Sequence, residues 1–528
     1  MAGDSTWWRR GAIYQIYPRS FADADGDGVG DLRGIVEHLD HLNDGTERSL
    51  GVEAIWLSPF YPSPMADFGY DVADYCDVDP AFGTLADFER LVEEAHRRGI
   101  KVVVDLVPNH TSDQHPWFRD SRAGRGSPRR DWYVWRDGRD GGRPPNDWAS
   151  TFRAVGPAWT YDPASEQWYL HSFLPQQPDL NWDEPAVEEA IHDVMRFWLE
   201  RGVDGFRIDV VQKLAKDPLL RDVVEGAPVP YEDWQPAIHE RLRRLRAVVD
   251  EYPDRMLVGE VYLLDLERIV AYVNSGDELH LAHNFTFVHL PWRMEAFRAA
   301  IDGFEALASA AAWPAWFVAN HDNPRVASRF DDDDQGPARA RAVLLMLYAL
   351  RGTPFVYQGE ELGLPDAAIP PDRVVDVDGR DPERAPIPWR PPSEAGPGAG
   401  FTTGDPWLPL AAEAEELAAQ RQSGDPRSTL ALTRRLAWLR RGEPALQSGA
   451  QRSLDAGADL LAWVRTGDDG TALLAIVNFA ARSRPFAGAP DLPPTAVLAL
   501  STDPDRAPGT LALETVTLGP GEALLLRL

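Results

Sequence analysis

Three acidic residues, each at the end of a short apolar stretch, are the residues of this chain best suited to chemistry. Asp209 ends the sequence Gly-Phe-Arg-Ile-Asp, Glu260 follows Met-Leu-Val-Gly, and Asp322 follows a third apolar stretch. Such stretches predict buried strands, so each acid is expected at the carboxyl end of a strand. A barrel of parallel strands builds its active site at those ends. Because burying one uncompensated charge costs several kcal/mol, three acids in this setting indicate chemistry.

The elements that must position these acids form a repeating pattern. Residues 85–98 and 187–201 carry apolar side chains at helical spacing, and a glycine follows each of these predicted helices. Strands alternating with helices predict parallel βαβ units, and eight strands predict a (β/α)8 TIM barrel of the α/β class. The eight predicted strands are 12–17, 54–58, 101–107, 205–209, 256–261, 284–287, 316–320 and 354–358.

Two regions depart from this alternation. About a hundred residues separate the third and fourth predicted strands, and their Trp, Pro, Gly and Arg content predicts an inserted subdomain at 107–179. From residue 448 to 528, strands without intervening helices predict an all-β sandwich domain. The barrel is therefore expected in two parts, 1–106 and 180–447, with an irregular excursion at 365–409 after the eighth strand.

Composition limits the possible partners. The 528 residues carry 53 basic and 83 acidic side chains, a net charge of −30, which makes nucleic acid and anionic membranes poor partners. Cys76 is the single cysteine, so no intrachain disulfide can form, and we expect it to act as a small apolar residue. The first residues lack the apolar core of a signal peptide, and no stretch is long enough to span a membrane. These features predict a cytoplasmic monomer or homodimer that acts on a small molecule.

Four segments resemble the signature regions of the α-amylase superfamily, glycoside hydrolase family 13. They are residues 105–110, 205–209, Glu260 and 320–322, and they occur in the family's order and spacing. A fifth segment, 177–182, resembles the form carried by the oligo-1,6-glucosidase and α-glucosidase branch. The resemblance runs from about Trp7 to the end of the chain and implies the same barrel fold.

The resemblance also implies roles for the acids. Asp209 would be the nucleophile and Glu260 the acid and later the base of a retaining reaction, which needs the two carboxyl groups about 5–5.5 Å apart. Asp322 would stabilise the transition state. Arg207 points to the same side of its strand as Asp209 and is expected to keep that carboxylate ionised, whereas burial and nearby negative charge would keep Glu260 protonated. His110 and His321 are expected to donate hydrogen bonds to the sugar.

Further residues resemble the part of the family's site that receives the terminal glucose. Asp67 and Tyr70 correspond to this site, with Tyr70 stacking on the sugar face. Arg380 resembles the arginine that pairs with this aspartate and closes the pocket beyond the sugar. A closed end favours removal of single glucose units. Phe152 and Phe173 either line the pocket or pack in the core.

An acidic loop follows the first predicted strand. In residues 23–31, carboxylates alternate with small residues and glycines, a pattern typical of a loop that binds a hard cation. The resemblance implies structural calcium or magnesium here, and an acidic turn without metal is the alternative. No cofactor is expected to take part in the chemistry. The expected ligands are the side chains of Asp23, Asp25, Asp27 and Asp31 and the carbonyl of Val29.

Val210 bears on which glycosidic bond is cleaved. Valine at this position resembles family members that accept α-1,6 linkages, whereas residues 64–71 and 259–262 resemble α-glucosidases that act on maltose. We therefore predict a retaining, exo-acting α-glucosidase that releases glucose from the non-reducing end of short maltose- or isomaltose-type oligosaccharides. The alternative is a transglucosylase or sugar isomerase of the trehalose synthase or sucrose isomerase type. A non-catalytic relative is disfavoured because all three acids are present.

Overall fold

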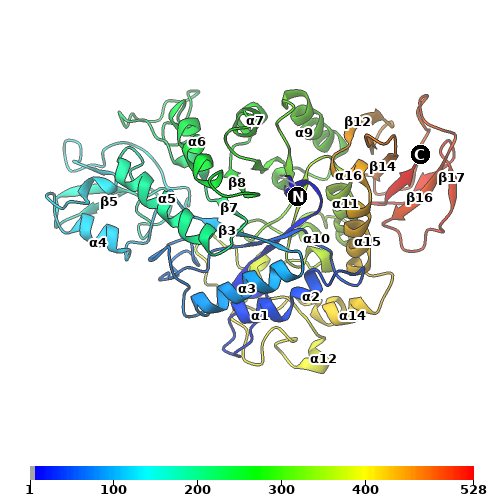
Figure 1. Cartoon of the computed structure of the whole chain (residues 1–528), viewed down its shortest axis with the longest axis horizontal. Coiled ribbons are helices and arrows are strands. Elements are labelled where there is room, and N and C mark those ends of the chain that lie inside the picture. Colours follow the sequence, from blue (N-terminus) through cyan, green and yellow to red (C-terminus); the bar gives the residue numbers. More distant parts are fainter. Residues whose placement is uncertain (1–5) are drawn as a thin grey trace.

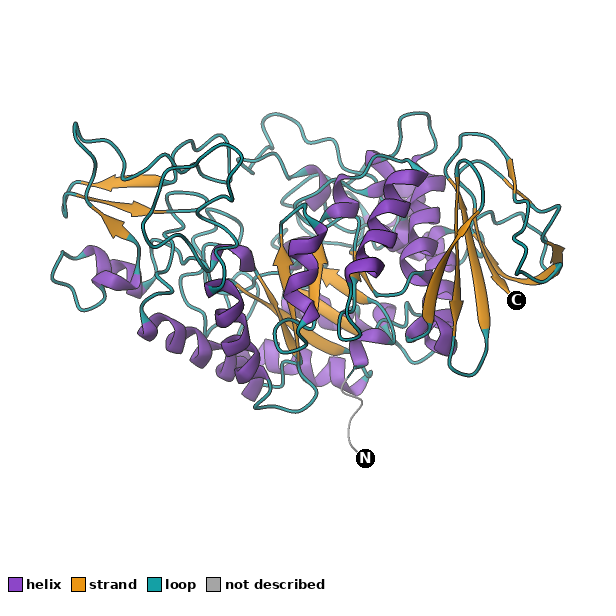
Figure 2. Ribbon diagram, turned by 90° about the horizontal axis from the view of Figure 1, so that it is seen from above, coloured by secondary structure: helices purple, strands orange, loops and turns teal. Residues whose placement is uncertain are grey.

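The computed structural model describes residues 6–528. Eight parallel strands close into a barrel in the order β1-β11-β10-β9-β8-β7-β3-β2, which confirms the predicted TIM barrel (Figures 1 and 2). The barrel strands are β1 (Ile13–Ile16), β2 (Ala54–Leu57), β3 (Lys101–Leu106), β7 (Gly205–Ile208), β8 (Met256–Val261), β9 (Leu281–Asn284), β10 (Ala315–Trp316) and β11 (Thr353–Tyr357).

The sixth strand differs from its prediction. The apolar residues at 284–287 suggested a strand, but β9 begins three residues earlier and Thr286–His289 forms the short helix α8. The side chain of Asn284 accepts a hydrogen bond from the backbone N of Thr286 at 3.0 Å, which turns the chain out of the strand. The seventh strand, predicted at 316–320, is also shorter, because β10 ends at Trp316.

The two predicted helices are present and show why they form. A capping box between Thr84 and Asp87 begins α3 (Leu85–Arg97), whose buried face packs against the barrel. Pro185 occupies the first position of α5 (Pro185–Glu200). The other helices of three or more turns are α6 (Ala237–Val249), α9 (Met294–Leu307), α11 (Gly336–Ala349) and α15 (Thr429–Gly442). Shorter helices include α1 (Leu32–Glu37), α2 (Leu39–Leu42), α4 (Pro116–Arg122), α7 (Leu266–Asn274) and α10 (Val326–Arg329).

A small antiparallel sheet lies between β3 and β7 in the sequence. Its order is β4-β6-β5, with β4 (Trp135–Arg136), β5 (Trp159–Asp162) and β6 (Gln167–Leu170). In both views this sheet and the C-terminal strands lie at opposite ends of the molecule, with the barrel between them (Figures 1 and 2). The subdomain boundaries at 107 and 179 stay a prediction.

The C-terminal region is all-β, as the sequence predicts, and its strands pair in antiparallel fashion. They form a six-stranded sheet, β12-β13-β14-β19-β16-β17, and a two-stranded sheet, β15-β18. The sequence did not reveal β12, because only Leu454 of its six residues is buried. The strands are β12 (Ala450–Asp455), β13 (Leu460–Thr466), β14 (Ala472–Asn478), β15 (Arg484–Pro485), β16 (Thr495–Ser501), β17 (Thr510–Ala512), β18 (Thr517–Leu518) and β19 (Ala523–Arg527).

Two further expectations concern single features. Cys76 is half-buried against the main apolar core, and burial raises the pKa of its thiol to about 11, so it behaves as a small apolar residue. Within residues 6–528, no helix combines the length and the apolar character that crossing a bilayer requires.

Candidate active site

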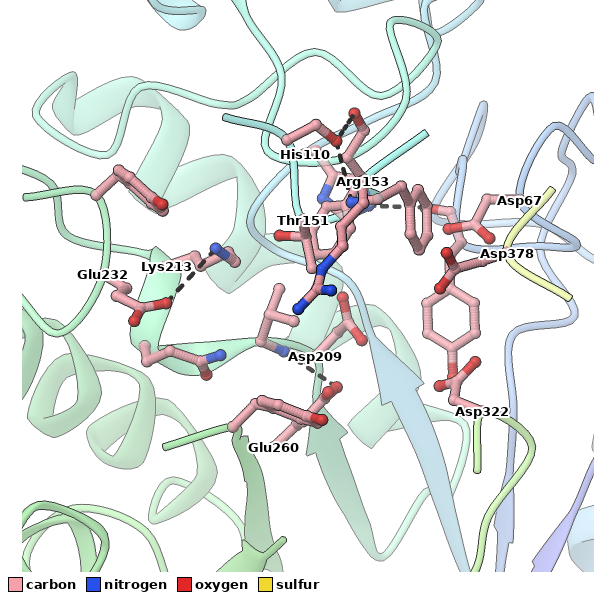
Figure 3. Close-up of a pocket in the computed structure, with 18 of the residues that line it drawn as sticks. Asp67, His110, Thr151, Arg153, Asp209, Lys213, Glu232, Glu260, Asp322 and Asp378 are labelled. Carbon is pink, nitrogen blue, oxygen red and sulfur yellow. Dashed lines mark hydrogen bonds and ion pairs between the residues drawn. The ribbon is translucent and has the colours of Figure 1, made fainter. Parts of the chain in front are cut away.

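One cavity of about 450 Å³ collects most of the residues that the sequence singled out (Figure 3). Loops that follow the barrel strands supply much of its wall, together with residues of the inserted stretch. Of the predicted site residues, the cavity is lined by Asp67, Tyr70, His110, Phe152, Phe173, Asp209, Val210, Glu260, Asp322 and Arg380. Arg207 and His321 lie directly behind this wall.

A single guanidinium holds the two acids expected to do the chemistry. Asp209 directly follows β7 and Glu260 lies on the neighbouring strand β8. Nη1 of Arg207 donates to Oδ1 of Asp209 at 2.8 Å, and Nη2 of Arg207 donates to Oε2 of Glu260. The two carboxyl groups therefore lie on the two arms of one side chain and line the same cavity.

The protonation of Asp209 differs from the expectation that Arg207 alone would keep it ionised. Burial raises the pKa of Asp209 well above its ordinary value, and the neighbouring Glu260 raises it further. Arg207 opposes both effects, but its Nη1 also donates to Asp105 at 2.8 Å, so its charge is shared among three carboxyl groups. Arg207 therefore does not fully offset burial, and the pKa of Asp209 stays raised.

Asp322 lies in the opposite electrostatic setting. Nη1 of Arg380 and Nη2 of Arg384 donate to its Oδ1 at 3.0 and 2.8 Å. Nε2 of His321 lies 3.2 Å from its other oxygen. Burial raises the pKa of Asp322, but the positive charges of Arg380 and Arg384 outweigh burial and hold the pKa well below its ordinary value. Asp322 is therefore ionised across the physiological pH range.

The predicted pair between Asp67 and Arg380 forms and closes one side of the cavity. Nη2 of Arg380 donates to Oδ1 of Asp67 at 2.7 Å, and Nε2 of Gln177 donates to the other oxygen at 2.9 Å. Arg380 also donates from its Nε and Nη2 atoms to the Asp376 carboxylate behind it, with a shortest contact of 2.6 Å. The aspartate is thus fixed from two sides, by an arginine and an amide.

Tyr70 stacks on His321, and His110 lines the cavity. The Tyr70 ring lies parallel to the His321 ring, with centroids 5.3 Å apart, and its hydroxyl donates to Asp105 at 3.2 Å. His321 is fully buried, with Nδ1 2.8 Å from the Gln15 amide, so it supports Tyr70 and Asp322 from behind rather than facing the cavity. Burial lowers the pKa of His321 to about 3, so this ring is neutral. His110 does line the cavity, and burial lowers its pKa as well.

Phe152, Phe173 and Val210 form an apolar wall, so these phenylalanines both line the cavity and pack together. The rings of Phe152 and Phe173 meet edge to face, with centroids 5.5 Å apart. The Arg380 guanidinium lies 5.0 Å from the centroid of the Phe152 ring. Val210 has a φ of +36°, a left-handed conformation that is strained for a β-branched residue. Its backbone N lies 3.4 Å from Oε2 of Glu260, so the strained turn directs this N–H toward the acid.

Other wall residues were missed by the sequence analysis. Most of them lie in loops without a recognisable pattern, so nothing local predicted them. Gln212 and Lys213 lie in the short helical turn η4 (Val211–Lys213), and Phe285 lies in the stretch 284–287 that was predicted as a strand. Arg384, which contacts Asp322, was also missed, four residues after Arg380. The additional lining residues are Ala149, Ser150, Thr151, Arg153, Gln212, Lys213, Tyr231, Glu232, Tyr262, Phe285, Asn323 and Asp378.

The acidic loop brings together only part of its predicted ligand set. Carboxylate oxygens of Asp23, Asp25 and Asp27 all lie within 4.8 Å of one another, and oxygen donors of this kind suit calcium or magnesium. Asp31 lies outside this group. Its two oxygens accept hydrogen bonds from the backbone N of Gly34 at 2.7 Å and of Ala24 at 3.0 Å, which caps α1 and closes the loop. Three acids therefore fit a cation, and Asp31 fixes the loop that carries them.

The fold and this arrangement of acids are those of a glycoside-cleaving barrel enzyme. Residues 15–449 match the family model of the alpha-amylase catalytic domain, and the chain belongs to the alpha-amylase family. It is 44% identical over 480 residues to a probable alpha-glucosidase of Rhizobium meliloti, covering 84% of each chain. It is 37% identical to an oligo-1,6-glucosidase of Parageobacillus thermoglucosidasius, over 83% of this chain and 84% of the relative.

A solved structure shows the same overall similarity. The trehalulose synthase MutB from Pseudomonas mesoacidophila superimposes with a TM-score of 0.91 at 35% sequence identity, covering 99% of both chains. Proteins similar to this chain therefore include both glucosidases and a trehalulose synthase.

Proposed function

We propose that this enzyme is a retaining, exo-acting α-glucosidase that releases glucose from the non-reducing end of short α-glucosides. The observation that carries the proposal is the position of Asp209 and Glu260 on the two arms of Arg207, in a cavity closed by Asp67 and Arg380. We infer that this closed end holds one terminal glucose, so that a bond inside a long chain could not reach the acids. The hydrolase names of the relatives support the same activity.

In the first half of the reaction, the Asp209 carboxylate attacks the anomeric carbon and the bond to the leaving oxygen breaks. Glu260 donates a proton to that oxygen, and a glucosyl-enzyme ester forms on Asp209. In the second half, water attacks the same carbon while Glu260 takes a proton from it. The carbon–oxygen bond to Asp209 breaks, and glucose leaves with its original anomeric configuration.

The electrostatic setting fits these roles once the sugar is bound. Asp209 must be ionised to attack, and Glu260 must carry the proton that it gives to the leaving oxygen. Asp322, kept ionised by Arg380 and Arg384, would accept hydrogen bonds from sugar hydroxyls and stabilise the positive charge that develops on the ring.

A second candidate is transfer of glucose to a sugar instead of water. It is favoured by the similarity to a trehalulose synthase over nearly the whole chain. Water and sugar would compete for the same glucosyl-enzyme, so the two activities share every residue of the first half-reaction.

The acidic loop would bind a structural metal ion. Asp23, Asp25 and Asp27 would hold calcium or magnesium, which would bridge the loop's charges and stabilise the fold without entering the reaction.

A rate panel tests the proposal. Purified enzyme is assayed on maltose, isomaltose, sucrose, trehalose and soluble starch, and the first-formed anomer of glucose is followed by proton NMR. We expect fast release of α-glucose from maltose or isomaltose and slow attack on starch. Rapid starch cleavage would contradict the closed pocket, β-glucose would contradict retention, and dominant new disaccharides would favour transfer.

A further inference from the structure

A second cavity lies at the end of the barrel opposite the acids. It also measures about 450 Å³, and each described segment that lines it comes shortly before a barrel strand. These segments are η1 (Trp7–Arg9) before β1, the end of α6 and the loop to β8, the end of α7 and the loop to β9, and the loop before β10. Because the barrel strands are parallel, these segments gather at the amino ends of the strands, away from the catalytic face.

The described residues that line this cavity carry more positive than negative charge. Three of them are arginines, Arg9, Arg246 and Arg255. The side chains of Arg246 and Arg255 are each 18% exposed, so both are largely withdrawn from bulk water. The acids are only two, Asp250 and Asp254, and the side chain of Asp250 is 55% exposed. This excess of positive charge occurs in a chain whose net charge is −30.

The guanidiniums of Arg246 and Arg255 are fixed on one side and open on the other. Arg246 donates from Nε to Asp250 at 2.8 Å and from Nη1 to two backbone carbonyls of the loop between α7 and β9. Arg255 donates from Nη1 to Asp204 at 3.2 Å. Within residues 6–528, no acceptor contacts Nη2 of either side chain, and neither Nη2 atom is enclosed by protein. Each arginine therefore keeps donors for a ligand.

His280 adds a neutral donor to the same wall. Its Nδ1 accepts a hydrogen bond from the backbone N of Leu257 at 3.0 Å, so the proton of the neutral ring is on Nε2. Burial and the charges of Arg246 and Arg9 lower the pKa of His280 to about 3, so the ring is neutral and lies in a positive potential. Trp8 packs edge to face against it, with centroids 4.7 Å apart. In the described part of the chain, no acceptor contacts this Nε2.

We propose that this cavity binds the phosphate or carboxylate group of a small molecule. A guanidinium presents directional, charged donors that match the oxygens of such a group, and these bonds are stronger than those between neutral partners. A cation would be repelled by Arg246 and Arg255, and a neutral ligand would gain nothing from their charge. A ligand that binds only the folded state also stabilises it, so the anion should stabilise the amino end of the barrel. This site would act independently of the reaction at the other end.

The test titrates inorganic phosphate and citrate into the enzyme by calorimetry, with sodium chloride at matched ionic strength as the control. Ala311 lines the cavity and is exposed, so it can be changed without removing any bond described above. Ala311→Glu places a like charge beside the bound anion, whereas Ala311→Gln has the same size without the charge. We expect the dissociation constants of both anions to be at least about 10-fold higher in Ala311→Glu than in Ala311→Gln.

A second pair of variants removes a donor instead of adding a charge. Arg246→Gln should weaken the binding of both anions by about 10-fold, because a hydrogen bond to a charged group is lost. Arg244→Gln is the matched control, since Arg244 lies on the same helix, pairs with Glu188 and does not line the cavity. Below the unfolding range, kcat/KM for maltose should be unchanged in all four variants, because none of them touches the catalytic cavity.

Hydrogen exchange of the wild type locates the anion without any substitution. Phosphate should slow exchange in peptides that cover 246–257 and 273–281. The inference is wrong if the wild type binds neither anion beyond the chloride control, or if Ala311→Glu and Ala311→Gln bind them equally. Binding that disappears when 1-deoxynojirimycin fills the active site would place the anion beside Asp209 instead. Protection confined to other peptides would equally exclude this cavity.

Discussion

At the scale of single residues, Arg207 is the side chain on which the site depends most. It is fully buried and contacts Asp105, Asp209 and Glu260, so it joins the acids of three adjacent strands or strand ends. Its charge lowers the cost of placing those carboxyl groups together in a buried site. The raised pKa of Asp209 shows that this compensation is incomplete before a substrate binds.

Val210 gives a prediction at the same scale. Its side chain is part of the apolar wall with Phe152 and Phe173, next to the acids. Threonine has the same shape and branching, so Val210→Thr keeps the strained turn and replaces one methyl group by a hydroxyl. We expect the ratio of kcat/KM for isomaltose to that for maltose to fall by about 10-fold, because a change of this size in a pocket is worth roughly 1–3 kcal/mol. The exposed Val224→Thr serves as the control, and an unchanged ratio removes Val210 from the choice of linkage.

At the scale of elements, the irregular stretch after β11 supplies the closed end of the cavity. Asp376 holds Arg380, and Arg380 reaches Asp67, which is 313 residues away in the sequence. The barrel strands fix the acids, and this loop fixes the cations that face them.

Asp376→Asn tests that dependence. The amide keeps the size of the side chain but loses the charge that holds Arg380, so the terminal glucose should bind less well. We expect KM for maltose to rise about 10-fold with a smaller change in kcat, since most of the loss is in binding. Asp372→Asn, an exposed aspartate in the same loop, should change neither constant. Unaltered KM in Asp376→Asn would show that Arg380 is held well enough by its other partners.

The acidic loop gives a second prediction for an element. Asp27→Asn retains the oxygen that accepts a hydrogen bond from the Val29 backbone N at 2.8 Å and removes one charged ligand. Calcium or magnesium at 100 times Kd should raise the free energy of unfolding of the wild type by about 2.7 kcal/mol, and the Tm with it. The variant should gain less. Below the unfolding range, kcat should be unchanged by a chelator. Asp44→Asn, in another exposed acidic turn, is the control, and a Tm that does not respond to either ion would remove the metal site.

At the scale of the whole molecule, buried carboxyl groups set how stability depends on pH. Burial raises the pKa of Glu383 to about 8 and of Glu360 to about 7. The folded state thus holds protons on these groups that the unfolded chain has already released. Their contribution is fully present below about pH 4.5 and is lost as pH rises through about 7 and 8. The histidines with lowered pKa values change the stability only below about pH 6.5, where the unfolded chain binds their protons. They therefore do not offset this loss at higher pH.

We therefore expect the free energy of unfolding to decrease as pH is raised from about 6.5 to 8.5, by an amount on the order of 1 kcal/mol. Glu383→Gln should make the decrease shallower above about pH 7, and the exposed Glu416→Gln should not. Chemical denaturation at several pH values measures both slopes. A wild type that gains stability over this range would contradict the assignment.

How far the structure can be predicted from the sequence also depends on scale. Strand ends and their acids could be predicted because the apolar stretches and the residues after them are local in sequence. Arg384 and Glu232 could not, since each lies in an irregular loop and is brought to its partner only by the closed barrel. The strand β9 was placed too late because His283 is polar although enclosed in the barrel, so hydrophobic pattern alone did not include the residues before Asn284.

The most direct test of the central claim is to trap the glucosyl-enzyme. A 5-fluoro-α-glucosyl fluoride has a good leaving group, and its ring fluorine slows the second half of the reaction, so the ester should accumulate. Mass spectrometry of the digested protein should find one fluoroglucosyl unit on the peptide that contains Asp209, and none in Asp209→Asn. A label on any other residue would contradict the role given to Asp209. Turnover without a covalent species under these conditions would contradict double displacement.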